Sequence, residues 1–83
     1  MAELIMYSTD PCSFCARAKE LLAKRGVPFT EVNLAKDPQG RAELAGRTGM
    51  MSFPQIVIDG TVLGGFRELL TADQEGRLEE LAA

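Results

Sequence analysis

The sequence contains no histidine and no tryptophan, and only two of its 83 residues are cysteine. No catalysis can therefore depend on an imidazole, and two cysteines are too few for the disulfide framework of a small secreted domain. Basic residues are also few, nine against twelve acidic ones, which gives a net charge of −3. This balance lacks the basic surface typical of nucleic-acid-binding proteins and membrane-surface helices. We therefore expect neither nucleic acid nor a membrane as a partner.

Long hydrophobic runs are missing as well. The apolar run over residues 4–7 is far shorter than the roughly 20 residues that a membrane-spanning helix needs. Because the chain has no basic start followed by a long apolar stretch, we expect no signal peptide and a cytoplasmic protein. The length fits one small domain, which we expect to cover residues 1–83 and to act as a monomer.

Turn residues divide the chain into short elements in the order β-α-β-α-β-β-α. Asp59-Gly60 is typical of a two-residue hairpin turn, and Gly76 is expected to break the last helix. A helix between the first two strands makes them parallel, so the sequence predicts an α/β fold with a four-stranded mixed sheet flanked by helices. The predicted strands cover residues 4–8, 28–34, 54–58 and 61–63, and the helices cover residues 13–25, 38 to near 49, and 66–82.

The two cysteines form one Cys-x-x-Cys motif, Cys12 to Cys15, at the start of the first predicted helix. Unpaired backbone N–H groups and the helix dipole favour negative charge at that place. The same effects lower the pKa of a cysteine thiol and make it a better nucleophile. Cys15 lies one helical turn further on, close enough to attack a mixed disulfide formed on Cys12. We therefore predict that Cys12 is the nucleophile and Cys15 the resolving thiol of a thiol–disulfide exchange.

Two other interpretations of the motif are weaker. A structural zinc site normally needs four ligands, and this chain has no third cysteine and no histidine. We therefore predict no metal site within one chain, although a metal or cluster shared between two copies stays open. Two buried, inert cysteines are also disfavoured, because Cys12 follows a proline at a helix start and should be accessible.

Three sequence blocks resemble the glutaredoxin family: residues 7–19 with the two cysteines, residues 48–60 around Pro54, and Gly64-Gly65-Phe66. Their order and spacing match the family over essentially the whole chain. The resemblance implies the thioredoxin-like fold and a thiol–disulfide oxidoreductase that serves electron transport and cell redox homeostasis. It also implies a cis peptide bond between Phe53 and Pro54, where a trans bond is the default for a sequence alone.

The resemblance further implies a substrate groove around Cys12. Arg47 lies near this groove in the family's layout, and a guanidinium group suits a substrate carboxylate. Two positions depart from the pattern of many relatives: Thr9 replaces a basic residue, and Arg67 stands where an acidic residue is common. The residues expected to bind substrate are Phe14, Arg47, Ser52, Phe53, Pro54, Gly65, Phe66 and Arg67.

The expected substrates are protein disulfides, or mixed disulfides between a protein and a small thiol. No tightly bound cofactor is expected, and the electron donor is open: glutathione, another low-molecular-weight thiol, or thioredoxin reductase. The run Gly65-Phe66-Arg67 is similar to glutaredoxin-like redoxins that thioredoxin reductase recycles. Ser13 replaces a common proline and resembles members that hold an iron–sulfur cluster between two chains. An iron–sulfur carrier bridged through Cys12 is therefore the alternative function.

Overall fold

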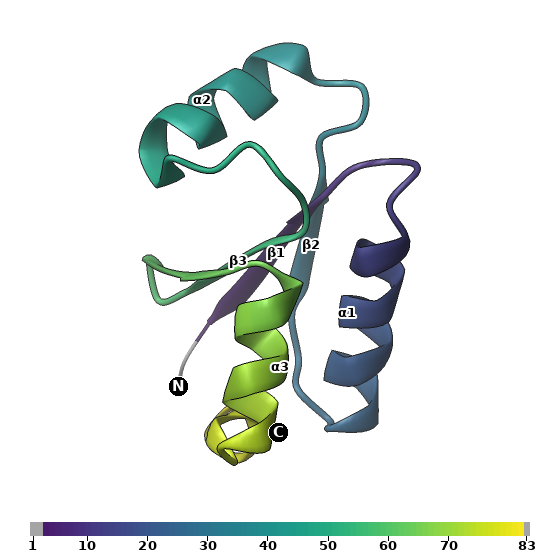
Figure 1. Ribbon diagram of the computed structural model, residues 1–83, viewed down its shortest axis with the longest axis vertical. Helices are drawn as coiled ribbons and strands as arrows, with labels where there is room; N and C mark the ends of the chain where they lie inside the picture. The colour runs from purple at the N-terminus through teal and green to yellow at the C-terminus, as the bar shows by residue number, and fades with distance from the viewer. Residues whose placement is uncertain (1–2, 83) are drawn as a thin grey trace.

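The structure is a computed structural model that describes residues 3–82. The predicted domain over residues 1–83 therefore includes three residues outside the described part. The elements follow the predicted order, with one short 3₁₀ helix added at the end (Figure 1). They are β1 (Leu4–Ser8), α1 (Ser13–Lys24), β2 (Thr30–Asn33), α2 (Pro38–Thr48), β3 (Gln55–Ile58), β4 (Thr61–Gly64), α3 (Phe66–Gln74) and η1 (Arg77–Leu81).

The sheet has the strand order β2-β1-β3-β4. β1 pairs parallel with β2 and antiparallel with β3, and β4 returns antiparallel to β3. This confirms the predicted mixed sheet of four strands. Figure 1 shows α1 and α3 side by side on one face of the sheet, with α2 on the other face. The loop after β1 leads directly into α1, so the Cys-x-x-Cys motif lies at one end of the central strand.

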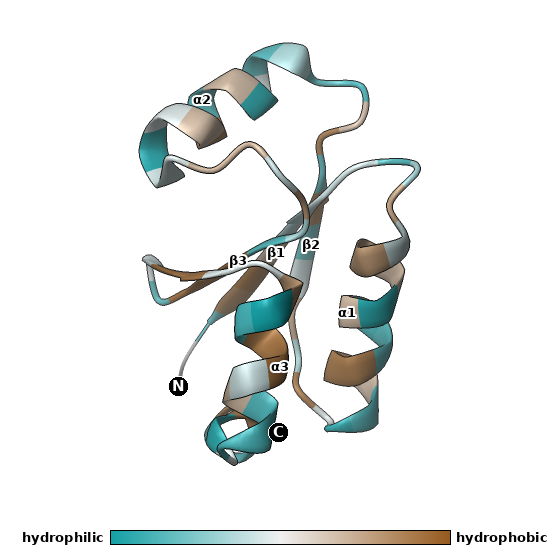
Figure 2. Ribbon diagram, in the orientation of Figure 1, coloured by the Kyte–Doolittle hydropathy of each residue, from teal (hydrophilic) through white to brown (hydrophobic). Residues whose placement is uncertain are grey.

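The main core lies between the sheet and the pair α1 and α3. Side chains of β1 alternate between buried and half-buried, as expected for a central strand. Figure 2 shows the hydrophobic residues of α1 and α3 on the sides that these helices turn toward each other. The most deeply buried apolar side chains, each at most 1% exposed, include Leu4, Met6, Leu22, Ile56 and Leu69. This packing fixes the start of both helices relative to the sheet.

Proline and glycine limit two of the elements. The second strand was predicted over residues 28–34 but covers only Thr30–Asn33, because Pro28 has no N–H to donate to a ladder. The last helix divides at Gly76, as predicted, where the backbone φ is +75°. Within residues 3–82, no helix is long and apolar enough to cross a membrane.

A side-chain ion pair joins the end of α1 to α3. The Arg25 guanidinium donates from Nε to one oxygen of Asp73 at 2.7 Å and from a terminal nitrogen to the other at 3.1 Å. The hydrogen bonds to Asp73, and then the charge of that carboxylate, raise the pKa of Arg25 above its usual value. This ion pair lies at the opposite end of α1 from the two cysteines, so it fixes the helix pair rather than the redox motif.

Candidate active site

Cys12 and Cys15 form a disulfide, with their Cα atoms 5.2 Å apart. Cys12 is the N-cap residue of α1, and its Sγ accepts a hydrogen bond from the backbone N–H of Cys15 at 3.1 Å. Cys12 is half-buried, whereas Cys15 is only 3% exposed and packs in the core. Only one sulfur of the pair is therefore well placed to meet a substrate.

Two side-chain hydrogen bonds tie the loop before Cys12 to the edge strand β2. Buried Ser8, the last residue of β1, donates from Oγ to Glu31 Oε2 at 2.7 Å. Asn33 donates from Nδ2 to Asp10 Oδ2 at 2.9 Å. The peptide bond between Asp10 and Pro11 is cis. The loop that carries the nucleophile is thus anchored at two points on β2.

The loop before β3 lies against the cysteines. The peptide bond between Phe53 and Pro54 is cis, which confirms the bond that the family resemblance implied. The Phe53 carbonyl oxygen lies 3.7 Å from Cys12 Sγ. A Cβ on Gly65 would lie 3.4 Å from the Pro54 carbonyl oxygen, an ordinary contact distance. The start of α3 therefore lies next to the proline loop.

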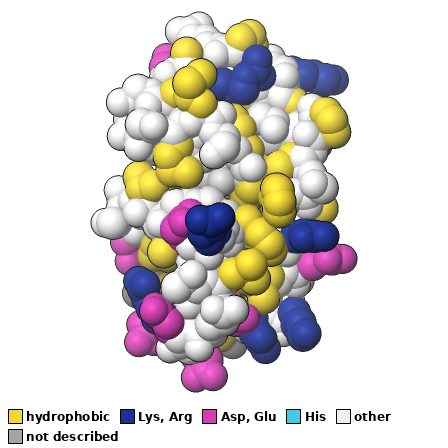
Figure 3. All heavy atoms as spheres, in the orientation of Figure 1, with side chains coloured by type: hydrophobic (Ala, Val, Ile, Leu, Met, Phe, Trp, Pro, Cys, Tyr) yellow, Lys and Arg dark blue, Asp and Glu magenta, His cyan; other side chains and the backbone are white. Residues whose placement is uncertain are grey.

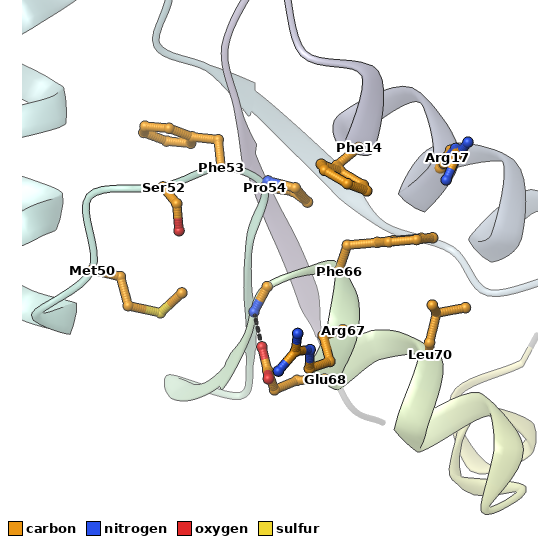
Figure 4. A pocket seen from close by; sticks show the side chains of 11 residues that line it. Phe14, Arg17, Met50, Ser52, Phe53, Pro54, Phe66, Arg67, Glu68 and Leu70 are labelled. Atoms are coloured by element: carbon orange, nitrogen blue, oxygen red, sulfur yellow. Dashed lines mark hydrogen bonds between the residues drawn. The ribbon is translucent and has the colours of Figure 1, made fainter.

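A cavity of about 620 Å³, called the groove below, opens beside these elements. Figure 4 shows its side chains, with Phe14 and Phe66 together on one side and Met50 and Ser52 on the other. The two phenyl rings have their centroids 5.7 Å apart. The lining residues are Phe14, Arg17, Met50, Ser52, Phe53, Pro54, Gly65, Phe66, Arg67, Glu68 and Leu70.

Most of the residues expected to bind substrate come together in this groove. Seven of the eight line it: Phe14, Ser52, Phe53, Pro54, Gly65, Phe66 and Arg67. Arg47 does not line it and lies exposed in the last turn of α2. Thr9 is not among the lining residues either. Four lining residues were not among those expected to bind substrate: Arg17, Met50, Glu68 and Leu70. The spacing of Arg17 from Phe14 by three residues, and of Leu70 from Phe66 by four, could have indicated Arg17 and Leu70.

The groove carries two arginines and one carboxylate. The Arg17 guanidinium carbon lies 5.8 Å from the centre of the Phe14 ring, a cation–π arrangement. Glu68 is occupied within the fold, because its Oε1 accepts the backbone N–H of Gly65 at 2.8 Å. Among residues 3–82, neither Arg17 nor Arg67 forms an ion pair. Figure 3 shows basic and hydrophobic side chains close together over the start of α3.

Gln55 was also missed by the sequence interpretation, although it fixes the loop that borders the groove. Its side chain is buried, at 1% exposed. Its Nε2 donates to the Met50 carbonyl at 3.0 Å, and its Oε1 lies 2.8 Å from the Thr48 hydroxyl. The Thr48 hydroxyl in turn accepts the backbone N–H of Met50 at 3.1 Å. No signal in the sequence indicates this role, because only the folded structure shows that the Gln55 amide is buried and needs hydrogen-bond partners.

Metal ligands do not gather in the described part of the chain. Residues 3–82 contain no group of three or more histidine, cysteine, aspartate or glutamate side chains that could hold a metal ion. Met50 and Met51 lie in the loop after α2, and Met50 lines the groove.

Comparison with known proteins gives a consistent family. The sequence model of the Glutaredoxin family matches residues 4–63. The chain is 40% identical to a glutaredoxin of Pseudomonas aeruginosa, over 98% of this chain and 96% of that protein. It is 37% identical to glutaredoxin 3 of Escherichia coli, over 98% of both chains.

Solved structures of glutaredoxins have the same fold. The solution structure of a glutaredoxin from Brucella melitensis superposes with a TM-score of 0.84 at 41% identity, over 98% of this chain and 88% of that one. A buckwheat glutaredoxin, solved as a glutathione complex, gives a TM-score of 0.86 at 24% identity, over 99% and 83% of the two chains. With its Cys12–Cys15 disulfide on a thioredoxin-like fold, the chain belongs to the glutaredoxin family of thiol–disulfide oxidoreductases.

Proposed function

We propose that Cys12 begins each exchange and Cys15 completes it. The observation that carries this assignment is the position of the two sulfurs. Cys12 Sγ is half-buried at the N-cap of α1 and accepts an N–H hydrogen bond at 3.1 Å, whereas Cys15 is 3% exposed. The N-cap hydrogen bond and the helix dipole stabilise a thiolate on Cys12. Burial makes Cys15 accessible only to a sulfur already bound to Cys12.

The proposed reaction transfers two electrons from the protein to a disulfide substrate. The Cys12 thiolate attacks one substrate sulfur, which forms a mixed disulfide and releases the other sulfur as a thiolate. The Cys15 thiolate then attacks Cys12 Sγ, so the substrate leaves as a second thiolate and the Cys12–Cys15 disulfide forms. The structure has this disulfide, which corresponds to the oxidised end of the cycle.

The groove is the proposed substrate site. Its apolar part, made by Phe14 and Phe66, suits the carbon chain next to a substrate sulfur, and Arg67 suits a carboxylate. Ser52, Phe53, Pro54 and Gly65 also line the groove, and the Phe53 carbonyl oxygen lies 3.7 Å from Cys12 Sγ. The proposed substrates are disulfide-containing proteins and their mixed disulfides with small thiols.

The proposed electron donor is glutathione, another low-molecular-weight thiol, or thioredoxin reductase. The buckwheat relative was solved with glutathione, which supports a thiol donor of this class. We further propose that the domain over residues 1–83 acts as a monomer in the cytoplasm, in electron transport and redox homeostasis.

The two cysteine roles can be separated by one pair of variants. Cys12→Ser should abolish reduction of both a protein disulfide and a protein–small-thiol mixed disulfide. Cys15→Ser should lose the first activity and keep the second, because reduction of a mixed disulfide by an external thiol needs only Cys12. Circular dichroism controls for folding. Equal loss of both activities in folded Cys15→Ser would refute the assignment. Visible absorbance of a cluster in protein purified without oxygen would instead favour an iron–sulfur carrier.

A further inference from the structure

A second cavity continues from the groove on the other side of the loop before Pro54. This cavity, of about 260 Å³, lies against α2 and is called the α2 cavity. It shares Met50 and Phe53 with the groove. In Figure 4 the Phe53 ring points away from Phe14 and Phe66. The two cavities are therefore neighbours on either side of one short loop that lies next to Cys12.

The chemistry of the α2 cavity is apolar. Besides Met50 and Phe53, it is lined by Ala42, Ala45, Met51 and Arg41. The Arg41 guanidinium is already used within the fold, because one of its terminal nitrogens donates to the backbone carbonyls of residues 34 and 35 at 2.6 and 2.9 Å. The remaining lining favours binding of an apolar ligand side chain, since burial of methyl, thioether and phenyl groups against it is favourable.

The exposure of Met51 also supports binding of an apolar group at the α2 cavity. Met51 is 86% exposed, the most exposed of the large hydrophobic side chains within residues 3–82. A flexible thioether at the rim of a cavity can adjust to apolar groups of different shape. Met51 therefore gives the α2 cavity a rim that an incoming apolar side chain would cover.

The groove adds a charge preference. Arg17 and Arg67 line it without an ion-pair partner among residues 3–82. Its one carboxylate, Glu68, is occupied by the Gly65 N–H. Two guanidinium groups against one carboxylate give the groove a net positive charge, which is complementary to a carboxylate rather than to an ammonium group.

We propose that the α2 cavity is a second substrate subsite, which binds an apolar side chain of a disulfide-containing polypeptide. An acidic residue on the other side of the substrate cysteine then contacts Arg17 or Arg67. The occupant is a polypeptide because residues in an extended chain are spaced by roughly 3.3–3.6 Å and can follow the loop from one cavity to the next. A small thiol fills the groove only. This inference rests on the proposed exchange at Cys12 and adds the class of substrate segment that it prefers.

The probes are short acetylated peptides with one cysteine, which carries 2-mercaptoethanol as a mixed disulfide. The first peptide has a leucine and an aspartate on opposite sides of the cysteine and is made in both orders. The second has alanine instead of the leucine, and the third has asparagine instead of the aspartate. Reduced protein attacks the peptide sulfur through Cys12, 2-mercaptoethanol leaves as the thiolate, and Cys15 then releases the peptide thiol. Second-order rate constants are measured in single turnovers, so no electron donor is needed.

We expect the leucine peptide, in its faster order, to react about five- to tenfold faster than the alanine peptide, as partial burial of one leucine side chain predicts. Ala42→Glu places a carboxylate at the α2 cavity and should bring this ratio to within about twofold of unity. Comparing two peptides that carry the same aspartate cancels the effect of the added charge on the acidic residue. The matched control is Ala23→Glu, the same change at an exposed position of α1 that lines neither cavity, and it should keep the ratio.

The aspartate peptide should react about two- to fivefold faster than the asparagine peptide, and Arg67→Gln should reduce this difference. A leucine-to-alanine ratio near unity in the unmodified protein would overturn the subsite, as would a full ratio in folded Ala42→Glu. The comparison in unmodified protein needs no variant to fold. If the reduced protein also fails to reduce 2-hydroxyethyl disulfide, the exchange at Cys12 itself is refuted. If it reduces that small disulfide without peptide preference, only the subsite is wrong.

Discussion

Replacing Gln55 by leucine tests whether one buried amide holds the loop beside the active site. The Gln55 side chain is 1% exposed and donates to the Met50 carbonyl at 3.0 Å. Its Oε1 lies 2.8 Å from the Thr48 hydroxyl, which also lies 3.0 Å from the Leu44 carbonyl. Leucine has a similar size and no polar atoms, so Gln55→Leu removes the hydrogen bonds without leaving a large cavity.

The magnitude follows from what each partner loses. The Thr48 hydroxyl has one proton and can still donate it to Leu44, so it loses little. The Met50 carbonyl loses its side-chain donor, and a buried polar group left without a partner costs about 1–3 kcal/mol. We therefore expect Gln55→Leu to lower the free energy of unfolding by about 2 kcal/mol. For a domain of this size, that corresponds to a fall in Tm of about 8–16 °C.

Thermal unfolding followed by circular dichroism measures this effect. Gln74→Leu is the matched control, because Gln74 is exposed at the end of α3 and surface changes usually stay within about 0.5 kcal/mol. Gln55→Leu should also slow exchange with disulfide peptides, because the loop over residues 50–53 borders both cavities. A Tm equal to that of the unmodified protein, or an equal fall in Gln74→Leu, would show that the amide does not hold the loop.

Three further predictions concern the nucleophile, the groove and the core. Alkylation of Cys12 in reduced protein should reach half its maximal rate at a pH below about 8.5, the pKa typical of a free cysteine. The reactive thiolate is protonated, and the rate falls, as the pH drops through this midpoint. A midpoint at about 8.5 would refute the stabilisation of the thiolate at the N-cap of α1. Glutathione-dependent turnover should be weak, because glutathione carries an ammonium group that Arg67 repels, and it should rise up to about tenfold in Thr9→Lys with Arg67→Asp. Because position 67 lines the groove and position 9 does not, Arg67→Asp alone should give most of the gain, and a loss of turnover in Arg67→Asp would show that Arg67 binds a glutathione carboxylate instead. Leu22 is 0% exposed, so Leu22→Ala should lower the free energy of unfolding, measured in urea, by about 2–5 kcal/mol. A smaller decrease would mean that the core closes around the gap.

The sequence was sufficient to predict the features that depend on local chemistry. The order of elements, the hairpin at Asp59-Gly60 and the break at Gly76 depend on residues that favour particular backbone angles. Asp59 has a φ of +50° and Gly60 a φ of +80°, as the predicted turn requires. The redox role of the cysteine pair could be predicted for the same reason, because its spacing and its position at a helix start are both local features of the sequence.

Features that depend on how loops and helix starts pack in the folded chain were not predicted. Gln55 and Met50 are five residues apart, and nothing in either residue type indicates that the amide turns inward to the carbonyl. Arg47 lies exposed in the last turn of α2 and does not line the groove, so its contact with a substrate carboxylate stays a prediction. The hydrogen bond from the Gly65 N–H to Glu68 depends on the backbone conformation just before α3, where Gly64 has a φ of +133°. Such contacts follow from the assembled fold and not from periodicity.

The central position of β1 determines how the site responds to local unfolding. Met6 is paired with Glu31 on one side and with Ile56 on the other, so its amide can exchange with solvent only when much of the sheet opens. The edge strands β2 and β4 lack a neighbour on one side, and edge elements open at lower free energy than the strands they flank. Hydrogen exchange should therefore be fast in β2 and β4 and slow in β1. Fraying of β2 releases both of its side-chain hydrogen bonds to Ser8 and Asp10 while β1 stays in place, so the loop before Cys12 loosens before the strand that leads to it.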